Sequence, residues 1–232
     1  MSGDSARQIP FEFLGPPAMD SASFVETAAN ATARAVIEHP EGWPEGRVML
    51  LGPPGSGKTH LARIWATGAG AFEVAAPALR SDAVPTLVGH GALVVEGIDT
   101  IAGRPGPAPE AARALFHLLN LARAEGARVL MTSRAAPAQL DWATPDLASR
   151  LAGTATAALL PPDDTLLGAV LAKLFADRGV EADARLITYL VQRMERSLAA
   201  AVETAERLDR AALAAQRRLT PSFAGRVLGW TG

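Results

Sequence analysis

Residues 52 to 59 have the sequence GPPGSGKT. It matches the phosphate-binding pattern G-x-x-x-x-G-K-[ST] at every specified position. The apolar run RVMLL at 47 to 51 predicts a buried strand before it, and HLARIWATGAG after Thr59 predicts a helix. A chance Gly-Pro turn is the alternative, but a glycine loop between a strand and a helix N-terminus is the arrangement that cradles phosphate.

The chemistry expected of this loop follows from its residue types. The glycines let successive backbone N–H groups point inward, Lys58 supplies a point charge, and Thr59 offers a hydroxyl to Mg²⁺. The nucleotide-binding set expected here is Gly52, Pro53, Pro54, Gly55, Ser56, Gly57, Lys58, Thr59 and His60. Of 22 basic residues only Lys58 and Lys173 are lysines, so lysine stands where a compact ammonium is wanted.

Composition narrows the class of protein. With 232 residues, 49% of them hydrophobic, the chain can bury a sizeable core. It has no cysteine, its four histidines lack metal-ligand spacing, and its net charge of -2 argues against broad binding to nucleic acid. We find neither a membrane-length apolar run nor a signal peptide, and we expect a cytoplasmic protein.

Alternating strand and helix patterns predict a parallel sheet sandwiched by helices. A helix is expected at 21–38 and another at 109–125, and further strands at 71–76, 92–97, 127–133 and 156–161. After the PPDD run at 161–164 only helical patterns occur. We therefore expect an α/β P-loop domain at 15–161 followed by a small all-helical lid domain at 162–232, with the nucleotide between them.

An acidic residue that follows a neighbouring strand is the expected Mg²⁺ ligand. In LVVEGID, residues 93 to 99, Glu96 fits this role together with Thr59. A carboxylate that merely caps a strand is the alternative. Gly97 stands where a water-activating carboxylate would follow, and Asp99 comes two residues later.

Five segments together give the chain a resemblance to the DnaA branch of the AAA+ ATPases, and within it to the Hda type, regulators that switch off the replication initiator. They are GPPGSGKT (52–59), VVEGIDTIAG (94–103), MTSRAAP (131–137), TPDLASRL (144–151) and the long helical run at 196–220. The resemblance covers nearly the whole sequence.

The resemblance implies roles for residues outside the phosphate loop. Arg150 would be an arginine finger acting in trans, Arg196 the sensor II residue, and Thr132 or Ser133 the sensor I group. Taken alone, Arg150 reads as a solvated arginine. Gly97 puts intrinsic ATP turnover in doubt, and Arg134 stands where initiators have an acid. The helix-turn-helix domain of DnaA is not expected, nor is origin recognition.

The N-terminus resembles the clamp-binding peptide of Hda proteins and polymerases. Within a flexible segment, 1–14, the residues Gln8, Ile9, Phe11 and Phe13 offer one hydrogen-bonding amide and alternating apolar side chains for a groove. A tail that folds back on the sheet domain is the alternative.

These resemblances imply a regulator that binds ADP or ATP with Mg²⁺, docks on the sliding clamp (polymerase III β subunit) at the bacterial replisome, and stimulates ATP hydrolysis by DnaA. Its own ATPase would be weak or absent. DNA contact would be indirect or weak, no membrane is implied, and a homo-oligomer remains open. The other readings are an autonomous P-loop enzyme and a DnaA-like adaptor that leaves hydrolysis unchanged.

Overall fold

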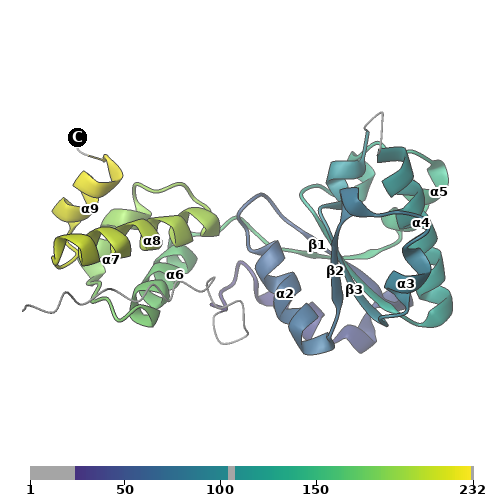
Figure 1. Ribbon diagram of the computed structural model, residues 1–232, viewed down its shortest axis with the longest axis horizontal. Helices are drawn as coiled ribbons and strands as arrows, with labels where there is room; N and C mark the ends of the chain where they lie inside the picture. The colour runs from purple at the N-terminus through teal and green to yellow at the C-terminus, as the bar shows by residue number, and fades with distance from the viewer. Residues whose placement is uncertain (1–23, 104–107, 231–232) are drawn as a thin grey trace, which may run out of the picture.

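The computed structural model describes residues 24–103 and 108–230. A five-stranded parallel sheet with helices on both faces forms one lobe, and a helical lobe follows it (Figure 1). The strands are β1 (Arg47–Leu51), β2 (Phe72–Ala75), β3 (Ala92–Glu96), β4 (Arg128–Ser133) and β5 (Ala155–Ala158). Their order in the sheet is β2-β3-β4-β1-β5, and all pairs are parallel. The carboxyl ends of β1, β3 and β4 therefore meet at one edge.

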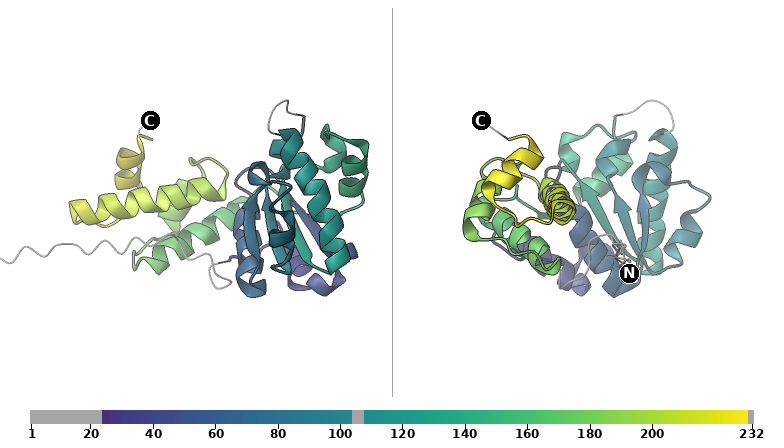
Figure 2. Two further views of the ribbon diagram at one scale, coloured as in Figure 1. Left: turned by 45° about the vertical axis from the view of Figure 1, so that its right-hand side comes forward. Right: turned by 60° about the vertical axis from the view of Figure 1, so that its left-hand side comes forward.

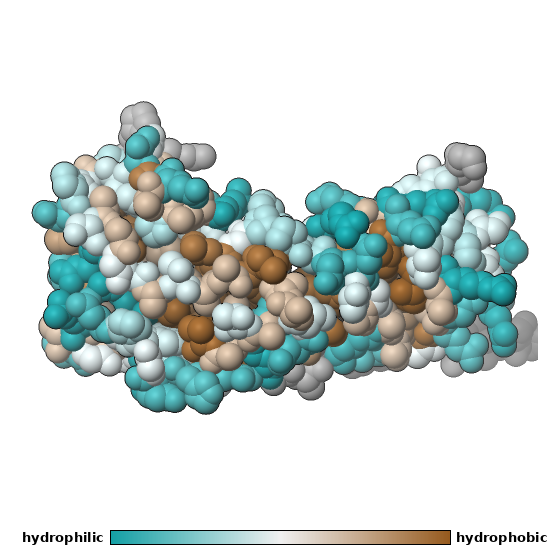
Figure 3. Space-filling view, turned by 180° about the vertical axis from the view of Figure 1, so that it is seen from behind, coloured by the Kyte–Doolittle hydropathy of each residue, from teal (hydrophilic) through white to brown (hydrophobic). Residues whose placement is uncertain are grey.

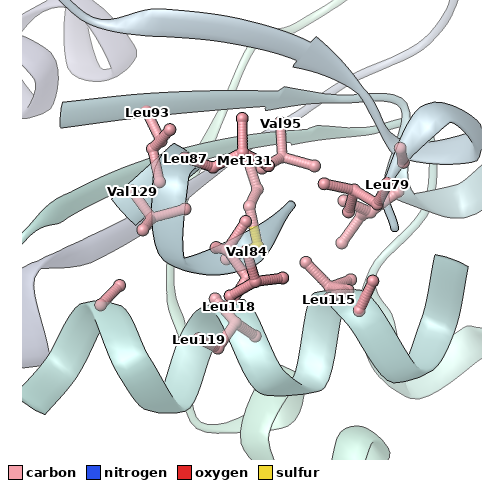
Figure 4. Close-up of a cluster of buried hydrophobic side chains, with 14 of the residues drawn as sticks. Leu79, Val84, Leu87, Leu93, Val95, Leu115, Leu118, Leu119, Val129 and Met131 are labelled. Atoms are coloured by element: carbon pink, nitrogen blue, oxygen red, sulfur yellow. The ribbon is translucent and has the colours of Figure 1, made fainter. Parts of the chain in front are cut away.

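Alternate residues of the central strands face two separate cores. Met49, Val95 and Met131 pack on one face against helices α3 (Val84–Val88) and α4 (Ala108–Glu125), as Figure 4 shows for part of this cluster. Val48 and Leu50 pack on the other face toward α1 (Ala31–Glu38) and α2 (Lys58–Ala69). The helices of this lobe are α1 (Ala31–Glu38), α2 (Lys58–Ala69), α3 (Val84–Val88), α4 (Ala108–Glu125) and α5 (Pro145–Ala152). Short 3₁₀ turns are η2 (Pro40–Gly42), η3 (Pro44–Gly46), η4 (Ala76–Ala78), η5 (Ile98–Ile101) and η6 (Pro137–Gln139).

The first helix begins later than its sequence pattern predicts. Helix α1 begins at Ala31, so residues 24–30 are not helical. The Asn30 side chain explains this, because its oxygen accepts from the Thr27 N–H at 2.9 Å while its nitrogen donates to the Val25 carbonyl at 2.9 Å. Such local bonds give the backbone an alternative to the helix.

The second lobe, or lid, is built from helices alone. They are α6 (Asp164–Asp177), α7 (Ala184–Val191), α8 (Leu198–Ala215) and α9 (Pro221–Leu228). A side chain caps each N-terminus, namely Asp163, Asp183, Ser197 and Thr220. These caps satisfy backbone N–H groups that lack partners within the helix. Phe175 and leucines from three helices fill the lid core.

The two lobes lie end to end, and the lid helices extend away from the sheet in Figure 1 and in the left view of Figure 2. From behind, a notch separates the lobes (Figure 3). The expected α/β domain with a helical lid is confirmed. Within residues 24–103 and 108–230, no helix has both the length and the apolarity needed to cross a membrane.

Candidate nucleotide-binding site

The GPPGSGKT segment joins the carboxyl end of β1 to the first turn of α2. Gly55 and Gly57 have φ angles of 71° and 97°, a backbone region that side chains with a Cβ rarely adopt. A Cβ atom at Gly52 would lie 2.6 Å from the Leu159 carbonyl oxygen, so this position is tightly packed as well. Three glycines thus shape the loop at the positive end of α2, where anions are favoured.

Lys58 is folded back onto this loop. Its Nζ donates to the carbonyl oxygens of Gly52 at 2.7 Å and Pro53 at 2.8 Å. Burial lowers the pKa of the Lys58 ammonium from its ordinary value, and the nearby carboxylates of Asp99 and Glu96 oppose this shift. The ammonium is thus held within the loop and partly desolvated, which strengthens its attraction for a phosphate oxygen.

Thr59 and Glu96 form the pair expected of a magnesium site. The Thr59 hydroxyl lies 3.4 Å from Oε2 of Glu96, across the gap between α2 and the end of β3. The other carboxylate oxygen, Oε1, is buried and has no hydrogen-bond partner. A buried carboxylate oxygen without a partner is costly, and a cation would satisfy it. One carboxylate and one hydroxyl suit Mg²⁺, which takes its remaining ligands from phosphates and water.

The ends of β3 and β4 are joined by Thr132. Its Oγ1 accepts from the Gly97 N–H at 2.9 Å, and this bond holds the backbone directly after Glu96. The hydroxyl of Ser133 turns the other way and donates to the Ala135 carbonyl at 2.6 Å. Of the two sensor I candidates, Thr132 therefore lies beside the acidic strand end.

Asp99 also belongs to the phosphate-loop edge. Gly97 has a φ of 70°, and the chain turns there into η5. The Asp99 carboxylate accepts from the Arg134 N–H at 3.2 Å and lies 3.7 Å from Nε of Arg134. The charges of Asp99 and Arg134 both affect the pKa of the Lys58 ammonium. An acid and a base from neighbouring strand ends are therefore paired in front of the loop.

The lid touches the phosphate loop through the start of α8. The Leu198 N–H donates to the Gly55 carbonyl at 2.9 Å, and a Cβ at Gly55 would lie 2.4 Å from Cβ of Ser197. Arg196, next to Ser197, forms a 2.6 Å ion pair with Asp164 at the start of α6. The sensor II candidate is thus near the loop along the chain, with its guanidinium bound within the lid.

Arg150 lies at the opposite end of the sheet. It occupies the last turn of α5, a helix capped by the Thr144 hydroxyl and started by Pro145. Its carbonyl oxygen lies 3.5 Å from Nη2 of Arg47, which is the first residue of β1, whereas the phosphate loop follows the last residue of β1. At ~3.3 Å per residue, the length of β1 separates Arg150 from the phosphate loop by about 15 Å.

Comparisons with solved structures place this architecture. Domain III of the Thermotoga maritima replication initiation protein DnaA aligns with a TM-score of 0.74 at 18% identity, over 92% of this chain and 96% of that one. AMPPCP-bound DnaA from Aquifex aeolicus gives 0.65 at 17% identity, over 88% and 70%. The Thermotoga maritima RuvB Holliday junction branch migration motor gives 0.63 at 15% identity, over 87% and 66%.

A family model matches the lid. Residues 164–228, which span α6 to α9, match the family described as Hda, lid domain. The helical lobe is therefore similar to the lid of Hda proteins, and it follows an α/β lobe with the fold of DnaA domain III. The resemblance seen in the sequence motifs is thereby confirmed.

Most of the nucleotide-site residues expected from the sequence lie together. The phosphate loop, Thr59, Glu96 and Thr132 share one edge, and the contact of Leu198 with Gly55 brings the lid to it. The Ser56 hydroxyl is buried there without a partner. The His60 ring packs edge-on against Phe24, with centroids 5.7 Å apart. Pro53 contributes its carbonyl to Lys58, and Pro54 follows it in the loop.

Two features of this site could not be predicted from the sequence. The pairing of Asp99 with Arg134 depends on the turn at Gly97, and the contact between Gly55 and Ser197 depends on how the lid docks. The glycine that follows Glu96 was the one sign in the sequence of the turn that pairs Asp99 with Arg134. Among the residues that the structure describes, no three histidine or acidic side chains cluster as metal ligands. The clamp-binding candidates Gln8, Ile9, Phe11 and Phe13 lie outside these residues.

The bond between Gly97 and Thr132 gives the first prediction. Replacing Thr132 by valine leaves the partly buried Gly97 N–H without its acceptor, so we expect the free energy of unfolding to fall by about 1 to 3 kcal/mol. Urea denaturation measures this change. Thr188→Val is the matched control, because it removes a hydroxyl that is exposed on α7. Equal stability of the two variants would contradict a structural role for the Thr132 hydroxyl.

Proposed function

We propose that this protein is a nucleotide-dependent regulator that docks on the DNA sliding clamp and stimulates ATP hydrolysis by the initiator DnaA. The observation that carries the proposal is the position of Arg150. It lies at the far end of the sheet from the chain's own phosphate loop, so its guanidinium is available to the nucleotide of another molecule. A partner of the same fold presents such a nucleotide.

Adenine nucleotide with Mg²⁺ is the proposed ligand of the chain's own site. The glycine loop, Lys58 and the buried carboxylate of Glu96 supply the groups that a nucleotide and its cation require. The likeness of the fold to DnaA bound to AMPPCP supports an adenine base. Thr59 and Glu96 would hold Mg²⁺, which when bound neutralises phosphate charge. Thr132 is the proposed sensor I residue and Arg196 the proposed sensor II residue.

Turnover at this site is proposed to be slow. A carboxylate that orients the attacking water normally stands close to the metal ligand, and Gly97 cannot supply one. Asp99, the next acid, is bound to Arg134 and has a side chain that is only 12% exposed. Nucleotide at this site would therefore set the conformation of the protein more than it would be consumed.

Clamp docking through residues 8–13 gives the second prediction. We expect Gln8→Ala and Phe13→Ala each to weaken binding to the clamp by about 1 to 3 kcal/mol, because each removes an anchoring side chain of a short peptide. Surface plasmon resonance on immobilised clamp measures the change, and Lys173→Ala on the far lid serves as a control. Unchanged clamp binding after deletion of residues 1–14 would contradict the assignment.

One experiment separates the proposed function from its alternatives. ATP hydrolysis by purified initiator is measured alone, with this protein, and with this protein plus DNA-loaded clamp. Faster hydrolysis by the initiator only in the last mixture supports the proposal. Hydrolysis by this protein alone at rates typical of enzymes, about 1 s⁻¹ or more, indicates an autonomous ATPase. Clamp and initiator binding without any change in hydrolysis indicates an adaptor.

A further inference from the structure

Three residues contact the end of α5 that carries Arg150. They lie at the end of the sheet that is opposite to the phosphate loop. They are Glu45 in η3, Arg47 at the start of β1 and Thr154 just before β5, and we call them the brace. Arg47 and Thr154 are buried, at 5% and 6% exposure. Buried polar groups of this kind need fixed partners, and the carbonyl oxygen of Arg150 is a partner of both residues.

The first part of the brace fixes the backbone of Arg150. The Thr154 hydroxyl donates to the Arg150 carbonyl at 3.1 Å, and Nη2 of Arg47 lies 3.5 Å from the same oxygen. Nε of Arg47 in turn donates to the Thr154 hydroxyl at 3.1 Å. The last carbonyls of a helix lack partners within the helix. Arg47 and Thr154 satisfy this one and so fix where α5 ends.

The second part of the brace is the carboxylate of Glu45, which faces three guanidinium groups. Its Oε2 lies 2.6 Å from Nη2 of Arg47 and 3.9 Å from Nη1 of Arg150, and its Oε1 lies 3.1 Å from Nη1 of Arg123. Three positive charges thus share one negative charge. Without Glu45, the Arg150 guanidinium would face two like charges across a partly buried space.

The backbone of Glu45 shows that this placement is imposed. Its φ of 51° and ψ of 28° lie in the left-handed region. Gln216 is the only other non-glycine residue with positive φ in the described part of the chain. Such conformations persist where the surroundings hold them, and they gather at functional sites. At Glu45 the side chain is ion-paired with both Arg47 and Arg123.

We propose that Glu45, acting with Arg47 and Thr154, is a positioning residue for Arg150. The brace fixes the end of α5 and holds the partly exposed side chain of Arg150 in the position from which it enters the nucleotide site of a bound initiator. This inference rests on the proposed function, in which Arg150 acts in trans. A phosphoryl-transfer step depends steeply on the position of the group that stabilises it.

The test compares Glu45→Gln with wild-type protein in the full chain. Hydrolysis of ATP by the initiator is measured with DNA-loaded clamp over a range of protein concentrations, which gives a maximum stimulated rate and a half-saturating concentration. Amounts are normalised to the fraction of protein that binds nucleotide. That site lies at the other end of β1 and reports folding independently. We expect the maximum rate to fall about tenfold or more, with the half-saturating concentration unchanged within about twofold.

The chain offers a matched control. Residues 40–42 and 44–46 are the same tripeptide, Pro-Glu-Gly, and Glu41 in the first copy pairs with His39 and not with Arg150. Glu41→Gln should leave both kinetic quantities unchanged. Thr154→Val is a second, independent variant, because it removes the hydroxyl that caps Arg150 while Glu45 remains. If Glu45→Gln fails to bind nucleotide, the maximum rate measured with Thr154→Val tests the positioning role in its place.

The outcomes distinguish the inference from the function on which it rests. Full maximum rate with Glu45→Gln, or a loss confined to the half-saturating concentration, overturns the positioning role while Arg150→Ala still abolishes stimulation. Should Arg150→Ala itself stimulate normally, the proposed function fails and the inference fails with it. A lowered maximum rate for Glu45→Gln but not for Glu41→Gln supports the brace.

Discussion

Replacing Arg150 with alanine is expected to lower the stimulated rate of ATP hydrolysis by the initiator by about 10³-fold or more, because a guanidinium supplied in trans stabilises charge on the transferring phosphoryl group. The fold should be unaffected. Arg150 is a quarter exposed, and its ion pair with Glu45 is long, at 3.9 Å. Partly exposed pairs of this kind contribute little to stability.

The measurement is phosphate release by the initiator in the presence of DNA-loaded clamp and saturating protein. Nucleotide binding and clamp binding by the variant are the controls, and both should match wild type. Arg150→Lys should restore little activity, since one ammonium does not reproduce the planar fork of a guanidinium. Undiminished stimulation by Arg150→Ala would remove the central observation from the proposed function.

The second large effect is expected at Lys58. Lys58→Ala removes the only charge among the residues of the phosphate loop, so affinity for ADP and ATP should fall by about a hundredfold or more. Isothermal titration calorimetry measures this loss. The only other lysine provides the control, because Lys173 lies on the lid and pairs with Asp177 at 3.3 Å. Lys173→Ala should bind nucleotide like wild type.

Stability must be followed in parallel, because the Lys58 ammonium also donates to two loop carbonyls. Thermal unfolding without nucleotide should show a small change, since those carbonyls can turn to water. Nucleotide should then raise the melting temperature of wild type and not of Lys58→Ala. Tight nucleotide binding by Lys58→Ala would contradict the assignment of the phosphate loop.

The sheet and its cores could be predicted because their signals are local. Apolar runs such as RVMLL alternate with amphipathic helices, and both β1 and α4 lie where these patterns place them. Helix α3, only five residues long, carries too few turns for a periodic signal. The predicted start of α1 was also wrong, because the side-chain hydrogen bonds of Asn30 override the apolar pattern.

The candidate site was predictable where one segment supplies the chemistry. GPPGSGKT specifies its own loop, and Glu96 follows from its place after a strand. Contacts between distant segments were not predictable. The brace joins residues more than a hundred positions apart, as in the bond between Arg47 and Thr154, and no spacing in the sequence announces it. Such long-range contacts become visible only once the strand order is known.

The contact between Gly55 and Ser197 bears on how this sequence can evolve. The phosphate-binding pattern leaves position 55 free, since only the first glycine, the last glycine and the two residues after it are specified. In this chain the lid removes that freedom, because any Cβ at position 55 would collide with Ser197, and the φ of 71° disfavours one as well. Positions 55 and 197 should therefore vary together among descendants of this sequence. In a library that randomises both positions and is selected for function, residues other than glycine at position 55 should occur only in variants whose lid lies further from the phosphate loop.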